Sequence, residues 1–208
     1  MKHPLRLTGA LAALALSLGG GAADVRADVK KHAALIGKPA PDLQADFAVN
    51  GKPLKLADLK GKVVLLTFWG PWSAPSRTAM LRLQEWYKEF LGKDLVILAV
   101  TRYNSDYGRP FAFDKEAGTV VKAKTANRET DRQLLRDFAA YHKLEFCLME
   151  LPKEEAERLY KEVYGVTTIP QFVLIDRGGR VRMVQAGAAR KQFEAIDEEI
   201  RKLLVERK

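Results

Sequence analysis

The sequence predicts an α/β fold: a central mixed sheet with parallel core strands, an antiparallel C-terminal hairpin, and helices on both faces. Two near-continuous apolar runs, 62–69 (KVVLLTFW) and 94–103 (DLVILAVTRY), are typical of strands buried on both faces. Residues 76–91 carry apolar side chains at helical spacing, and a helix between two such strands indicates parallel pairing. Residues 171–185, with Arg-Gly-Gly-Arg at their centre, predict the antiparallel hairpin.

The other elements follow from the same periodicities. Three further helices are expected where apolar residues recur on one face: 130–142, 154–164 and 191–204. Residues 145–149 predict a short strand. The Asn50-Gly51 pair favours a tight turn and predicts a hairpin that joins 47–49 to 52–54. Residues 104–130, rich in Asn, Gly, Pro and alternating charges, interrupt this order and are expected to form an inserted loop or exposed hairpin.

The first 27 residues have the pattern of a secretory signal peptide. Lys2 and Arg6 precede an apolar run at 7–18, and small residues lead to Ala23 and Ala27, with cleavage after Ala27 favoured. The apolar run is short for a bilayer span, so an uncleaved anchor is the weaker alternative. The mature chain is expected to be secreted or periplasmic, and to meet the membrane only through the transient signal peptide. A linker at 28–36 and one domain at 37–205 follow.

The composition fits one globular domain and excludes several classes of function. Of 208 residues, 47% are hydrophobic and 29% are charged, which allows a sizeable core. One cysteine permits no internal disulfide and no cysteine-based zinc site, so neither metal nor cofactor is expected. The net charge is +9, but Lys and Arg alternate with Asp and Glu along the expected helices, and no nucleic-acid partner is expected.

Residues 68–77 (FWGPWSAPSR), where the first buried strand meets its helix, resemble the active-site segment of the TlpA/ResA-like secreted redoxins. Three more segments resemble that family in the same order: 37–41 (GKPAP), 56–62 (LADLKGK) and 164–176 (YGVTTIPQFVLID). The match covers most of residues 37–205. The resemblance implies a thioredoxin-like fold, a cis-proline loop at Pro170, and a family activity of thiol–disulfide exchange.

The same segment lacks the groups which that activity needs. Exchange requires a thiolate that attacks a disulfide sulfur, yet Ser73 and Ser76 stand at the two cysteine positions of the resembled family. Ala79 stands where the family has a proton-carrying glutamate, and Leu81 where it has a helix-kinking proline. Because these departures are linked, we interpret the site as degenerate through natural loss, with no catalytic residue expected.

Several side chains at the site have an ordinary structural interpretation. Ser73 is expected to cap the helix, and Ser76 to be solvated or hydrogen-bonded in its first turn, rather than to act as nucleophiles. Cys147 is expected to be a buried structural thiol, although a one-cysteine reaction through it stays open. Trp69 is assigned to the core, while Trp72 is divided evenly between packing and partner contact.

The leading hypothesis is a secreted thioredoxin-like protein that has lost dithiol chemistry and keeps a peptide-binding groove. The groove would be formed by Trp72, Ser73, Ala74, Pro75, Thr168, Ile169 and Pro170. An extended peptide or protein segment would pair there with the backbone of Ile169. One alternative is an oxidoreductase of the same family that works through Cys147 or a partner's thiols. Another is an assembly module that docks through residues 104–130.

Overall fold

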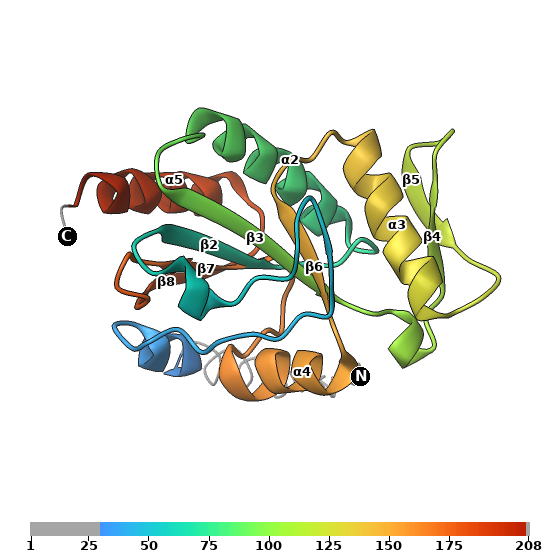
Figure 1. Cartoon of the computed structure of the whole chain (residues 1–208), viewed down its shortest axis with the longest axis horizontal. Helices are drawn as coiled ribbons and strands as arrows, with labels where there is room; N and C mark the ends of the chain where they lie inside the picture. The colour runs from blue at the N-terminus through green and yellow to red at the C-terminus, as the bar shows by residue number, and fades with distance from the viewer. Residues whose placement is uncertain (1–29, 207–208) are drawn as a thin grey trace, which may run out of the picture.

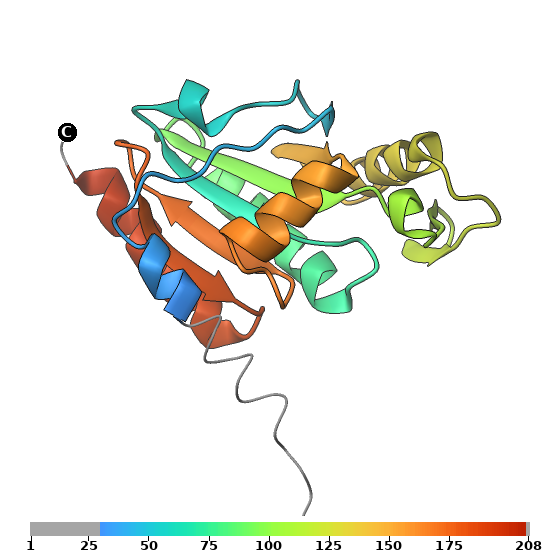
Figure 2. The same cartoon turned by 90° about the horizontal axis from the view of Figure 1, so that it is seen from below.

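A computed structural model describes residues 30–206, so the expected signal peptide lies outside the described residues. A six-stranded sheet has helices on both faces (Figure 1). Its strands run in the order β1 (Phe47–Val49), β6 (Cys147–Leu151), β3 (Leu95–Arg102), β2 (Val63–Phe68), β7 (Gln171–Ile175) and β8 (Val181–Ala186). One face carries α2 (Ala74–Glu89), α3 (Arg128–Tyr141) and α5 (Arg190–Val205). The other carries α4 (Lys153–Glu157) and the π-helical turn η3 (Arg158–Val163) (Figure 2).

The pairing pattern confirms the predicted mixed sheet. β2 runs parallel to β3, and β3 runs parallel to β6, so the centre is parallel. β7 is antiparallel to β2 and to β8, which gives the expected C-terminal hairpin. Parallel strands end at the same edge of a sheet, so the segments that follow β2, β3 and β6 are brought together. The loop that leads into β7 joins them, because β7 runs the other way.

The predicted hairpin around Asn50-Gly51 is wrong. Asn50 and Gly51 do adopt positive φ values of 61° and 143°, but residues 52–54 form no strand. β1 pairs instead with β6, antiparallel, and the Asn50 side-chain amide donates to the carbonyls of Leu144 and Phe146. Pro53 has no N–H to donate to a ladder, while β6 offers β1 a free edge.

Two apolar clusters hold the layers together. On the α2, α3 and α5 face the largest buried side chains include Trp69, Trp86 and Phe138. On the opposite face Phe68 contacts Tyr160 and Tyr164, with ring centroids 5.2 and 5.1 Å apart. Both tyrosines belong to the turn where the predicted helix 154–164 becomes π-helical, and the N–H of Tyr164 donates to the carbonyl five residues back.

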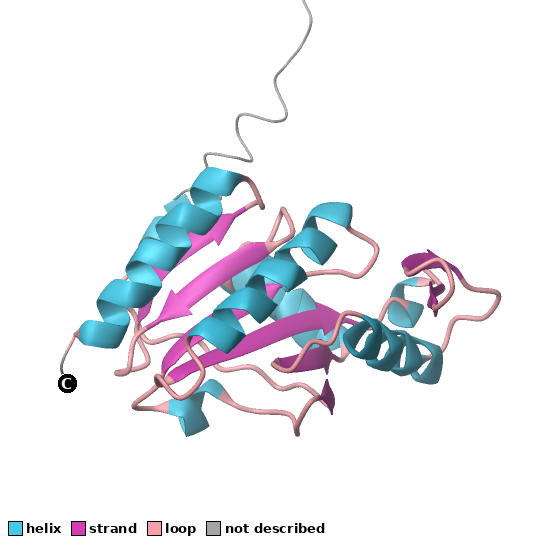
Figure 3. Ribbon diagram, turned by 90° about the horizontal axis from the view of Figure 1, so that it is seen from above, coloured by secondary structure: helices cyan, strands magenta, loops and turns pink. Residues whose placement is uncertain are grey.

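Residues between β3 and α3 form the turn η2 (Ser105–Tyr107) and a separate hairpin of β4 (Phe111–Asp114) and β5 (Thr119–Lys122). The hairpin lies beyond α3, at the end of the molecule away from α5 (Figure 3). Phe113 attaches it to α3 through edge contacts with Phe138 and Tyr141. The expected insertion at 104–130 therefore contains a hairpin that packs on the domain.

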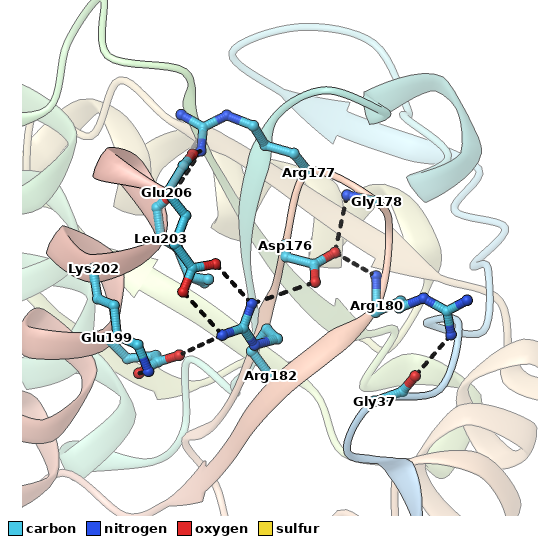
Figure 4. Close-up of polar contacts among 10 residues, drawn as sticks. All are labelled: Gly37, Asp176, Arg177, Gly178, Arg180, Arg182, Glu199, Lys202, Leu203 and Glu206. Carbon is cyan, nitrogen blue, oxygen red and sulfur yellow. Dashed lines mark hydrogen bonds and ion pairs between the residues drawn. The ribbon is translucent and has the colours of Figure 1, made fainter. Parts of the chain in front are cut away.

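The turn between β7 and β8 anchors the C-terminal helix (Figure 4). The guanidinium of Arg177 donates to the carbonyls of Leu203, Leu204 and Glu206 at the end of α5. Arg182 forms ion pairs with Asp176, Glu199 and Glu206. A cavity of about 610 Å³ lies beside this network. It is at the opposite end of β2 from Ser73, because Ile175 pairs with Val64 at the start of that strand.

The segment 28–36, expected to be a linker, contains a helical stretch at residues 30–35. The Lys31 ammonium donates to the carbonyl of Lys161, and the His32 ring contacts the carbonyl of Gly165 at 3.1 Å. The stretch therefore packs against the turn that follows α4. Within residues 30–206, none of the helices combines the length and the apolar character that a membrane span requires.

Candidate functional site

Ser73 caps α2, as predicted. Its backbone is extended, and its Oγ accepts a hydrogen bond from the N–H of Ser76 at 3.4 Å. Pro75 lies in the first turn, where its missing N–H costs nothing. A helix N-terminus of the kind that stabilises a thiolate is therefore present, but the group there is the Ser73 hydroxyl, which accepts a hydrogen bond from the helix backbone.

The prediction that Ser76 is solvated or hydrogen-bonded is wrong for its side chain. Ser76 is fully buried, and its Oγ finds no hydrogen-bond partner within residues 30–206. The helical repeat explains this, because Ser76, Ala79, Met80 and Leu83 form the stripe of α2 that faces the sheet. Ala79 is fully buried on the same stripe, so a carboxylate there would enter the core.

The loop between β2 and α2 is held in one shape by close packing. The Trp72 indole lies against Gly70, where a Cβ would come within 2.6 Å of the ring. Arg77 donates to the carbonyl of Pro71 at 2.9 Å. Trp72 is half-buried and stacks on Phe111 of the β4–β5 hairpin, with ring centroids 6.1 Å apart. The packing role of Trp72 is therefore confirmed, and its contact with a partner stays a prediction.

The second loop of the predicted groove lies at the same end of the sheet. Gln171 is opposite Phe68, so Pro170 is beside the residues that follow β2. The peptide bond between Ile169 and Pro170 is cis. Thr168, Ala74 and Pro75 are exposed, Ile169 is half-buried and Pro170 is buried. The two loops thus border one another with exposed residues on each.

Cys147 is a buried free thiol, 8% exposed, at the start of β6. Burial raises the pKa of the Cys147 thiol to about 11, which keeps it protonated at neutral pH. Its sulfur faces the carbonyl of Lys52 at 3.9 Å, and the side chain lies on the α4 face of the sheet with Met149. The surroundings are those of a structural cysteine, as predicted.

A row of buried polar side chains, which the sequence did not predict, lies beneath α3. Glu150 lies opposite Thr101 in the ladder, and Trp69 is beside Thr101 because its N–H donates to Val100. All three are almost fully buried, and each has one polar side-chain atom without a hydrogen-bond partner in the described part of the chain. Burial raises the pKa of Glu150 to about 9, with a further increase from Asp131. Glu150 is therefore a neutral acid at pH 7.

Arg102 is a further residue of this region that the sequence did not predict. It ends β3, and its guanidinium carbon lies 4.1 Å from the Tyr107 ring centroid and 5.6 Å from that of Trp72. The Nζ atom of Lys153 lies 5.6 Å from the centroid of the same Tyr107 ring. Tyr160 donates a long 3.5 Å hydrogen bond to the carbonyl of Trp69 in the same region. An arginine that ends an apolar strand, and an acid inside one, were the signals available in the sequence.

Residues 30–206 contain no group of three His, Cys, Asp or Glu side chains that is placed to hold a metal ion. The cationic groups of Arg102 and Lys153 and the rings of Trp72 and Tyr107 lie together where β2, β3 and β6 end.

The sequence and the fold both place the chain among the thioredoxin-like redoxins. Residues 36–184 match the AhpC/TSA family, so the chain belongs to that family. It is 35% identical to the thiol-disulfide oxidoreductase ResA of Bacillus subtilis over 151 residues, which are 73% of this chain and 67% of ResA. ResA of Bacillus thuringiensis is 26% identical over 168 residues, or 81% and 78% of the two chains. The resemblance to TlpA/ResA-like proteins is thereby confirmed.

Solved structures agree with this placement. A putative thiol:disulfide interchange protein DsbE from Chlorobium tepidum matches with a TM-score of 0.56 and 26% identity, over 81% of this chain and 97% of that one. A putative protein disulfide isomerase from Bacteroides thetaiotaomicron has a TM-score of 0.58 at 23% identity, over 82% and 91%. The second likeness shows the fold alone. The thioredoxin-like fold predicted from the sequence is confirmed.

Proposed function

We propose that this protein is a thioredoxin-like redoxin without dithiol chemistry, which binds an extended peptide or protein segment between the β2–α2 loop and the Ile169–Pro170 loop. The observation that carries the proposal is the state of the two cysteine positions. The Ser73 hydroxyl accepts the hydrogen bond that caps α2, and Ser76 is buried in the core. A serine oxygen forms no mixed disulfide, so the function that we propose for this end of the sheet is binding without exchange.

The alternative oxidoreductase mechanism through Cys147 gains no support. The thiol is buried and its pKa is raised, whereas a reactive cysteine is partly exposed with a lowered pKa. Docking through residues 104–130 is also less favoured, because Phe111 and Phe113 of the hairpin are already engaged by Trp72, Phe138 and Tyr141.

Export belongs to the same proposal. The chain would be made with residues 1–27 as a signal peptide, cut after Ala27, and would act outside the cytoplasm. Partners would then be secreted or envelope proteins rather than cytoplasmic ones. The N-terminal sequence of the protein purified from a secreting host tests this part, with Asp28 expected as the first residue.

Binding is tested by selecting a displayed library of octapeptides on the mature Cys147→Ser protein, in which no thiol is left to trap a peptide covalently. We expect a sequence family to be enriched, and we expect Thr168→Trp to abolish its binding, because a bulky side chain at this exposed position would cover the Ile169 backbone. Thr125→Trp, also at an exposed threonine but in the segment that precedes α3, is the matched control and should bind normally. Failure to enrich any family, or equal binding by Thr168→Trp, would contradict the proposal.

A further inference from the structure

We propose that Arg102 anchors a carboxylate of the bound segment, so that the partner is an extended peptide with an aspartate or glutamate a few residues from the one that pairs with Ile169. This inference rests on the proposed function and adds the chemistry of the partner. It is carried by the position of Arg102, by the rings that hold it, and by the balance of charge around it.

The position follows from the strand order. β7, β2 and β3 are neighbours, and Pro170, the β2–α2 loop and Arg102 stand at the same edge of these three strands. β6 is next, and Lys153 follows its last residue by two positions. A peptide that lies across this edge from Ile169 therefore passes Trp72 and then reaches Arg102. Adjacent strands are about 4.8 Å apart, so the distance is that of a few extended residues.

The guanidinium of Arg102 lies over two aromatic rings. The guanidinium carbon is 4.1 Å from the ring centroid of Tyr107 and 5.6 Å from that of Trp72. The Nε atom of Arg102 is inaccessible and has no hydrogen-bond partner within residues 30–206. Stacking of this kind fixes a long side chain in advance, which lowers the entropy lost when its terminal nitrogens bind a carboxylate in a forked geometry.

The surrounding charges leave Arg102 uncompensated. Glu157, on the neighbouring α4, pairs with Lys161, and Asp106 in η2 pairs with Arg128. Neither Arg102 nor Lys153 forms an ion pair with any residue that the structure describes. The edge therefore presents two cations next to aromatic surface, and the charge complementary to it is negative. The partial positive charge at the start of α2 has the same sign.

The same octapeptide library tests the inference. On the wild-type surface we expect an acidic residue to be enriched at one fixed position, and we expect Arg102→Glu to replace it with Lys or Arg. A synthetic peptide of the selected sequence and its Glu→Gln isostere then serve as probes. Arg102→Gln should weaken binding of the acidic probe about tenfold and leave the isostere unchanged, because one charge-assisted contact is lost. Lys153→Gln should have a smaller effect in the same direction.

The controls separate this inference from the proposed function. Arg180→Gln changes an exposed arginine in the β7–β8 turn, at the opposite end of the sheet from Pro170, and should bind both probes as the wild type does. If Arg102→Gln weakened both probes equally, Arg102 would only hold the loop in shape, and the inference would be wrong. The inference would also be wrong if the selected peptides lost binding to Thr168→Trp but showed no enrichment of an acidic residue. The proposed function would stand in that case. If no peptide were enriched at all, both would fall.

Discussion

At the scale of single residues, Ser73 and Ser76 look equivalent in the sequence but have opposite energetic roles. Loss of the Ser73 cap should lower the free energy of unfolding by about 0.5–1 kcal/mol in Ser73→Ala, since the hydrogen bond is long. Ser76→Ala should be neutral or stabilising, because it removes a buried hydroxyl that has no partner in the described residues. Chemical denaturation of the two variants measures the difference. A larger loss in Ser76→Ala would contradict this account of the α2 start.

Glu150 gives the fold a pH dependence of known sign. Its pKa is raised by burial to about 9 in the folded protein, against about 4.3 in an unfolded chain. The folded state therefore holds the proton more tightly, and the stability that Glu150 contributes is present below about pH 4 and is lost as the pH rises toward 9. Glu150→Gln has a side chain that is always neutral. At about pH 8 its melting temperature should be several degrees above that of the wild type, and at about pH 4 the two melting temperatures should be the same.

The control for this prediction is Glu116→Gln, at an exposed position in the turn between β4 and β5. It should change the melting temperature little at either pH. A Glu150→Gln variant whose advantage stays constant between the two pH values would mean that folding does not raise the pKa of Glu150.

At the scale of elements, Arg177 connects the β7–β8 turn to the end of α5. It donates to three carbonyls that have no partner within the helix, an arrangement favoured by the negative end of the helix dipole. Arg177→Ala should lower the free energy of unfolding by about 1–2 kcal/mol. Arg190→Ala, at the start of the same helix and in an exposed pair with Glu194, should cost less than about 0.5 kcal/mol. Equal losses in urea denaturation would show that the two arginines contribute alike.

The elements that the sequence predicted well are those whose pattern reports local burial. The buried runs 62–69 and 94–103 and the hairpin 171–185 appear almost unchanged as β2, β3, β7 and β8. Features that depend on distant partners were beyond such patterns. Asn50 turns the chain as its type suggests, but β1 pairs with a strand about a hundred residues away. Similarly, the burial of Ser76 is set by which stripe of α2 meets the sheet.

The same limit applies to the site. Ser73 and the Pro170 loop were found because a resemblance pointed to them, whereas Cys147 was found as the one cysteine of the sequence and is buried as predicted. Arg102 and Glu150 were not predicted, because the environment of each is set by side chains on other elements. Tyr107 and Trp72 lie against Arg102, and Asp131 raises the pKa of Glu150 further.

At the scale of the whole molecule, a thioredoxin-like fold carries serines at positions 73 and 76. The parallel centre still delivers the ends of β2 and β3 to one edge, and α2 still begins there with a capped N-terminus. The β4–β5 hairpin adds Phe111 to that edge, against Trp72. The proposed absence of dithiol exchange therefore rests on the side chains at positions 73 and 76 and not on a change of fold.

The most direct test is reduction of insulin by dithiothreitol, followed by turbidity, with the mature wild-type protein and its Cys147→Ser variant. We predict that both leave the rate at the background value, because neither serine exchanges disulfides and the Cys147 thiol is buried and protonated. Ser73→Cys combined with Ser76→Cys supplies the positive control for the scaffold and should raise the rate above background. Turnover by the wild type that disappears in Cys147→Ser would contradict the account and establish a one-cysteine oxidoreductase.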